Sequence, residues 1–65
     1  MKFRELEKKI KADGWKLQNV EGSHYHYFHG DKPGKTTIPY HSGDIDRAIV
    51  NSVLKQAGLK QEKTT

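Results

Sequence analysis

Apolar residues near the start of the chain recur at the spacing of a helix. Phe3, Leu6 and Ile10 lie three and four positions apart with charged residues between them, which predicts an amphipathic helix within residues 1–13. Gly14-Trp15 follows directly. A glycine suits the left-handed position after a helix, and the apolar residue behind it can pack back on Ile10, as in a Schellman motif.

The same pattern returns near the other end of the chain and predicts a second helix. Its apolar positions are Ile45, Ile49, Val50, Val53, Leu54 and Ala57. Asp44 stands just before them, and aspartate is a favourable N-cap. Gly58-Leu59 repeats the ending of the first helix.

The residues between the helices have the composition of short strands. Segments 15–20, 24–29 and 35–39 are aromatic or β-branched and are separated by glycine-containing turns. Two amphipathic helices need one apolar surface, so we predict an α+β fold of order α-β-β-β-α, a three-stranded antiparallel sheet with two helices on one face. This layout is that of a double-stranded-RNA-binding-like fold. We expect one domain over residues 1–60 and a polar tail over 61–65.

The predicted core is small, because only 32% of the 65 residues are hydrophobic. We expect it to consist mainly of Leu6, Ile10, Trp15, Leu17, Ile38, Ile45, Ile49, Val53 and Leu54. Both faces of the segment 24–29 carry aromatic residues, so parity does not decide which face is buried. No apolar run is long enough for a membrane helix or a signal peptide, and we expect a cytoplasmic protein.

Positive charge favours an anionic partner. Twelve Lys and Arg residues face eight Asp and Glu residues, for a formal net charge of +4. Such a balance fits nucleic acid or an acidic protein, although it also fits a solvated surface. Lys16 and Lys35 adjoin predicted strands and are candidate phosphate contacts.

Gly22-Ser23-His24 is the segment with the clearest chemistry. A histidine after a tight turn opens a strand beside backbone N–H groups, and imidazole exchanges a proton near neutral pH. RNA is cleaved without metal when the 2′-hydroxyl attacks the adjacent phosphorus, which requires such a proton carrier. The alternative is a surface histidine without a role.

The four histidines do not suggest a metal site. His24 and His26 share one face of a strand, His29 points to the other face, and His41 is in a distant loop. Zinc normally needs three or four well-placed ligands, and the chain has no cysteine. We therefore expect no metal and no other cofactor.

Four short motifs in register resemble those of HicA-type toxins. They are Ala12-Asp13-Gly14-Trp15, Gly22-Ser23-His24, Thr37-Ile38-Pro39-Tyr40-His41 and Leu54-Lys55-Gln56-Ala57-Gly58-Leu59. The resemblance covers about residues 1–60 and implies a small endoribonuclease that cleaves mRNA, has a double-stranded-RNA-binding-like fold and is neutralised by a HicB antitoxin. The catalytic histidine of the family is the one in Gly-Ser-His, which corresponds to His24.

The resemblance leaves three points open. Ala48-Ile49-Val50-Asn51 stands where family members commonly read Gly-Thr-Leu-Arg. The second proton carrier is His26, His41, Lys35 or water. The alternative to a ribonuclease is a non-catalytic RNA-binding module of the same fold. For the ribonuclease, the predicted substrate-binding residues are Gly22, Ser23, Lys35 and Lys16.

Overall fold

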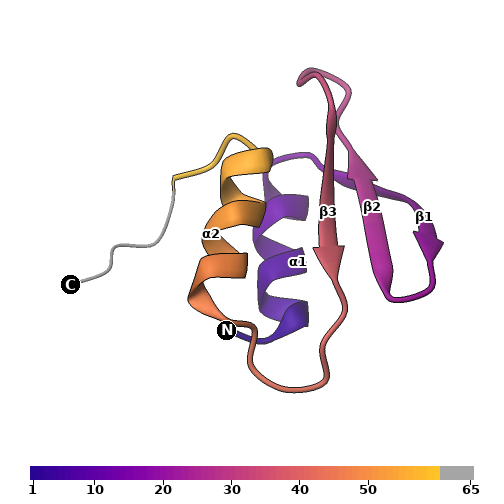
Figure 1. Cartoon of the computed structure of the whole chain (residues 1–65). Helices are drawn as coiled ribbons and strands as arrows, with labels where there is room; N and C mark the ends of the chain where they lie inside the picture. Colours follow the sequence, from indigo (N-terminus) through magenta and orange to yellow (C-terminus); the bar gives the residue numbers. More distant parts are fainter. Residues whose placement is uncertain (61–65) are drawn as a thin grey trace.

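Two helices and three strands follow one another in the order that the sequence predicts (Figure 1). The computed structural model describes residues 1–60, so the predicted polar tail at 61–65 lies outside the described residues. The elements are α1 (Phe3–Ala12), β1 (Lys16–Glu21), β2 (His24–Phe28), β3 (Lys35–Pro39) and α2 (Arg47–Gln56). The predicted strands and helices are therefore confirmed, with boundaries that differ by a few residues.

Both helices end in the predicted Schellman motif. At the end of α1, Trp15 N–H donates to the Ile10 carbonyl over 3.2 Å, and Gly14 N–H donates to the Lys11 carbonyl over 3.0 Å. The same pair of bonds closes α2, from Leu59 to Leu54 and from Gly58 to Lys55. Gly14 has a φ of +110°, and a Cβ there would lie 2.6 Å from His29 Nε2, so only glycine fits this position.

The start of α2 differs from the prediction. Asp44 is not the N-cap, because the helix begins two residues later, after Asp46. Asp44 instead forms an isolated β-bridge with Lys2 and accepts ion pairs of 3.8 Å from the Lys2 ammonium and the N-terminal ammonium. Ile45 N–H also donates to the Met1 carbonyl over 2.7 Å, so this segment pairs with the N-terminal residues before α2 begins.

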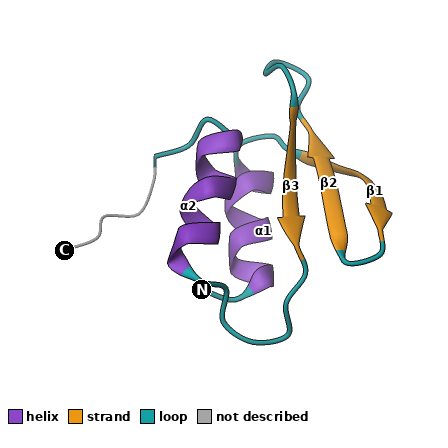
Figure 2. Cartoon of the chain, viewed as in Figure 1, coloured by secondary structure: helices purple, strands orange, loops and turns teal. Residues whose placement is uncertain are grey.

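The sheet is antiparallel, in the order β1-β2-β3. A two-residue turn, Gly22-Ser23, joins β1 to β2; Gly22 has a φ of +61° and Ser23 has a negative φ, which is a type II′ hairpin turn. The two helices lie side by side on one side of the sheet, as predicted (Figure 2). Tyr25 and Tyr27 face them, while His24, His26 and Phe28 lie on the opposite face, which we call the open face.

The core fills the space between the helices and the sheet. Of the predicted core residues, seven are buried: Leu6, Ile10, Trp15, Ile38, Ile45, Val53 and Leu54. The core also holds Phe3, Tyr27, Val50 and Ala57. Tyr27 is fully buried because it points from the central strand toward α1.

Two predicted core residues are exposed instead. Leu17 on β1 is 41% exposed, because the two helices cover the other two strands. Glu7 of α1 contacts Tyr27 of β2. Helix α2 lies along the outer edge of β3, where Gln56 Oε1 accepts a hydrogen bond from Thr37 N–H. Neither helix extends over Leu17. Ile49 is 39% exposed because the buried stripe of α2 runs through Val50, Val53, Leu54 and Ala57, and Ile49 lies beside this stripe.

Among the carboxylates of residues 1–60, that of Glu7 is buried, between α1 and the sheet. The Tyr27 hydroxyl donates to Glu7 Oε2 over 2.6 Å, and Arg4 Nη1 donates to Oε1 over 3.0 Å. Burial raises the pKa of Glu7, but these two hydrogen bonds and the charge of Lys11 outweigh burial and lower the pKa below its ordinary value. Burial and the contact with Glu7 raise the pKa of Tyr27, so its hydroxyl keeps the donated proton.

We expect the free energy of unfolding to decrease in acid, partly through Glu7. A carboxylate with a lowered folded pKa stabilises the protein above its unfolded pKa, near 4.5, and this stabilisation is lost as the pH falls through the lower folded pKa. Glu7→Gln removes this titration. Urea denaturation at about pH 6 and about pH 3 should therefore show a smaller loss of stability for the variant than for the parent. Equal losses in the two proteins would contradict the role given to Glu7.

Candidate functional site

His24 lies at an exposed corner of the sheet. It is the first residue of β2, directly after the Gly22-Ser23 turn, and its cross-strand partners are Glu21 and Pro39. Tyr40 N–H donates to the Ser23 carbonyl over 2.6 Å, which ties the turn to the segment that leaves β3. His24 is thus exposed on a backbone that is hydrogen-bonded on both sides. Of the predicted substrate-binding residues, Gly22 and Ser23 adjoin it.

His26 is the next side chain on the open face and is held in place by its neighbours. Its Nε2 lies 2.8 Å from Glu21 Oε1 and its Nδ1 lies 2.9 Å from Thr37 Oγ1. The residue is only 8% exposed, although this face carries no helix. The ring centroids of His24 and His26 are 6.5 Å apart. The site therefore has two imidazoles on one face, one free to reach solvent and one fixed between two strands.

Lys16 and Lys35 lie at the far end of the open face. Both are opposite Phe28, one on each side of β2. Phe28 is four positions from His24 along the strand, which corresponds to about 13 Å. The structure therefore does not bring these two predicted substrate contacts to His24, although it places them on the same face.

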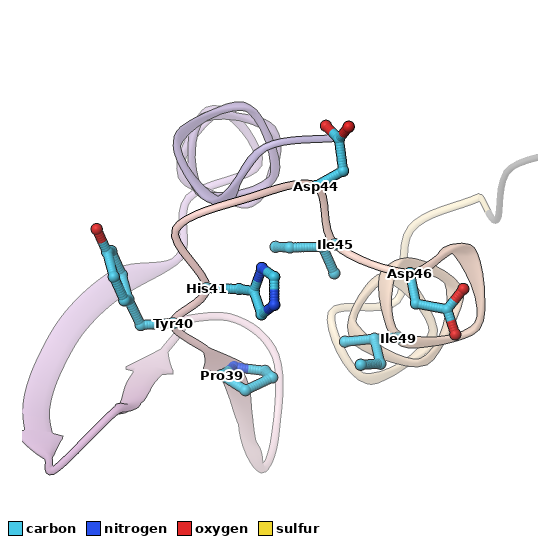
Figure 3. A pocket seen from close by; sticks show the side chains of 7 residues that line it. All are labelled: Pro39, Tyr40, His41, Asp44, Ile45, Asp46 and Ile49. Carbon is cyan, nitrogen blue, oxygen red and sulfur yellow. The ribbon is translucent and has the colours of Figure 1, made fainter.

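His41 lines a hollow between the end of β3 and the start of α2 (Figure 3). The hollow has a volume of about 170 Å³ and is lined by Pro39, Tyr40, His41, Asp44, Ile45, Asp46 and Ile49. Figure 3 shows the His41 ring pointing into it, toward Ile45. Its Nδ1 accepts a bond of 3.1 Å from Gly43 N–H. The hollow adjoins the His24 corner through Pro39, which is opposite His24.

His29 has a structural role at the other end of the molecule. Its ring packs edge-on against Trp15 with centroids 5.4 Å apart. Asp31 N–H donates to Nδ1 over 2.9 Å, and Nε2 lies 2.7 Å from the Asp13 carbonyl, so one neutral tautomer satisfies both contacts. Lys32 Nζ binds the Asp13 carboxylate over 2.5 Å, and this hydrogen bond lowers the pKa of Asp13.

The part of the chain that the structure describes holds no group of three or more His, Cys, Asp or Glu residues placed to bind a metal ion. Nor does any helix within residues 1–60 have the length and apolar character needed to cross a membrane.

Two residues that contact His26, Glu21 and Thr37, were missed from the sequence. The signal that could have found them is the cross-strand register, which for β1 and β2 is set by the tight Gly22-Ser23 turn.

Residues 3–59 match the family model described as the HicA toxin of bacterial toxin–antitoxin. The match spans all five helices and strands and includes His24. A search among curated proteins gives no match.

Proposed function

Because the chain belongs to the HicA toxin family of bacterial toxin–antitoxin systems, we propose that it is an endoribonuclease that cleaves mRNA, with His24 as general acid–base. Family membership makes it a toxin with a cognate antitoxin. The observation that carries the proposed chemistry is that His24 is exposed at a corner of the sheet whose backbone is hydrogen-bonded on both sides. Its ring centroid lies 6.5 Å from that of His26. The nearby Gly22 and Ser23 are the proposed contacts to the scissile phosphate.

In the proposed reaction, the 2′-oxygen of a nucleotide attacks the adjacent phosphorus. His24 takes the 2′-hydroxyl proton as the P–O bond forms, and the P–O5′ bond breaks. The leaving 5′-oxygen takes a proton from a second group. The products are a 2′,3′-cyclic phosphate and a free 5′-hydroxyl, and no other reactant is consumed.

The geometry favours His26 as the second proton carrier. The attacking and leaving oxygens lie on opposite sides of the phosphorus, so two imidazoles on one face can bracket a single phosphodiester. Lys35 of β3 lies opposite Phe28, at the other end of the sheet from His24, and His41 points into the hollow beside α2. Glu21, whose side chain is 70% exposed, can leave His26 Nε2 when substrate arrives.

Incubation of the purified protein with an end-labelled RNA tests this function. We expect cleavage that survives a chelator and leaves 2′,3′-cyclic phosphate ends, because the proposed step uses only histidines. Cleavage that stops on chelation, or that leaves 5′-phosphate ends, would contradict the mechanism. Binding without any cleavage would favour the alternative function, a non-catalytic RNA-binding module.

We also propose that a HicB-like antitoxin inhibits the protein by covering His24. The exposed imidazole has no covering segment within residues 1–60, and the net charge of +4 favours approach of an acidic partner. Equimolar cognate antitoxin should reduce RNA cleavage to background and shift the His24 ring signals in the NMR spectrum. A tight complex that leaves both the cleavage rate and the His24 signals unchanged would contradict this proposal.

A further inference from the structure

Phe28 is an exposed aromatic side chain that the fold does not use. Its residue is 44% exposed on the open face, at the end of β2 away from His24. Within residues 1–60 its ring contacts no other ring, whereas Tyr25 and Tyr27 on the same strand are engaged by Phe3 and Glu7. A single exposed apolar residue is ordinary on a protein surface, so a binding role for Phe28 has to be argued from the residues around its ring.

Those surroundings are two lysines, one on each side. Lys16 of β1 and Lys35 of β3 are both directly opposite Phe28, so all three side chains leave the same face of the sheet. Neither lysine forms an ion pair with any residue that the structure describes. An aromatic face flanked by two free cations matches the chemistry of a nucleotide, which presents a flat base next to anionic phosphates.

The position of this cluster relative to His24 indicates how a substrate would lie. His24, His26 and Phe28 occupy every second position of β2 and therefore lie on one face, with about 13 Å between His24 and Phe28. An RNA strand that follows β2 therefore meets the proposed proton carriers at one end and the aromatic ring at the other. A base can stack on a protein ring only if it is unpaired, which excludes the interior of a duplex.

We propose that Phe28, Lys16 and Lys35 form a second RNA subsite. In this subsite an unpaired base stacks on Phe28, and the two lysines bind the phosphates beside that base, so that single-stranded RNA is held along β2 with its scissile bond at His24. The inference deepens the proposed function and rests on it. It makes Phe28 a binding residue, separate from the proton carriers.

The binding test uses His24→Ala protein, which holds RNA without the proposed cleavage. Fluorescence anisotropy with a labelled single-stranded RNA should show affinity about 5- to 150-fold lower after Phe28→Ala, and Phe28→Trp should restore it. Val20→Ala is the matched control, because Val20 is 45% exposed on the opposite face of the sheet, and its affinity should not change. Replacing both lysines by alanine should reduce the slope of log affinity against log salt by about 1.4.

The cleavage test separates the subsite from the catalytic proposal. In protein that retains His24, Phe28→Ala should raise KM for a long RNA and leave cleavage of a dinucleotide unchanged, because a dinucleotide at His24 does not extend to Phe28. Unchanged affinity of Phe28→Ala for single-stranded RNA would overturn the subsite, whether or not the parent cleaves RNA. A parent that binds RNA through Phe28 and never cleaves it would instead overturn the proposed function alone.

Discussion

Replacing Leu54 by alanine is expected to lower the free energy of unfolding by about 2–5 kcal/mol. Leu54 is 1% exposed on α2 and belongs to the single cluster that forms the core. Removing its branched end leaves a cavity between α2 and the sheet that a domain with few core residues cannot refill. Since small domains are stable by only about 5–15 kcal/mol, this loss is a large fraction of the total.

Ile49→Ala is the matched control on the same helix. Its side chain is of the same size, but the residue is 39% exposed beside the hollow, so we expect a loss of less than about 1 kcal/mol. Urea denaturation of the parent and both variants gives the comparison. Equal losses for Leu54→Ala and Ile49→Ala would show that the buried face of α2 is wrongly assigned.

Replacing His24 by alanine is expected to lower the rate of RNA cleavage by about 10²–10⁴-fold. Without the imidazole, the 2′-hydroxyl loses the group that takes its proton. The fold should be unchanged, because His24 is exposed and its backbone bonds in the sheet are independent of the side chain. Most RNA affinity should also remain, since the proposed Phe28 subsite lies at the other end of β2.

Two controls separate a catalytic loss from a structural one. Gln18→Ala changes another exposed side chain of the sheet and should cleave RNA at the parent rate. Added imidazole should partly restore cleavage by His24→Ala, because a free base can enter the space that the side chain leaves. A disturbed circular dichroism spectrum for His24→Ala would instead assign the histidine a structural role.

The presence of both helices and their C-terminal ends were predictable from local patterns. Gly14 and Gly58 stand where the chain requires positive φ, and the apolar residues behind them close the motifs. The start of α2 was not predictable, because Asp44 is drawn away from capping by its bridge to Lys2. That contact joins the N-terminal residues to the segment before α2, 42 positions along the chain, and has no signature in the sequence near Asp44.

The exposure of Leu17 depends on tertiary structure in the same way. A bulge shifts the register of β1 between Leu17 and Asn19, so Leu17 and Val20 lie on the same face although they are three positions apart. Alternation along the sequence does not reveal such a bulge. The placement of α2 along β3 then leaves this face of β1 uncovered.

The candidate site was only partly predictable. The Gly22-Ser23 turn was enough to predict that His24 is the first residue of a strand. Predicting the contacts of His26 with Glu21 and Thr37 requires the register of all three strands. Because both faces of β2 carry aromatic residues, predicting the exposure of Phe28 requires the position of the helices. Lys16 and Lys35 were predicted to bind substrate, and the register of the strands shows that they lie about 13 Å from His24 along the sheet.

The role of His24 is tested most directly by cleavage of one end-labelled RNA under single-turnover conditions. Parent and His24→Ala protein are compared with and without chelator, beside their circular dichroism spectra. The predicted result is chelator-resistant cleavage by the parent and a rate about 10²–10⁴-fold lower for a folded His24→Ala variant. A folded His24→Ala protein that cleaves at nearly the parent rate would contradict the proposed role of His24.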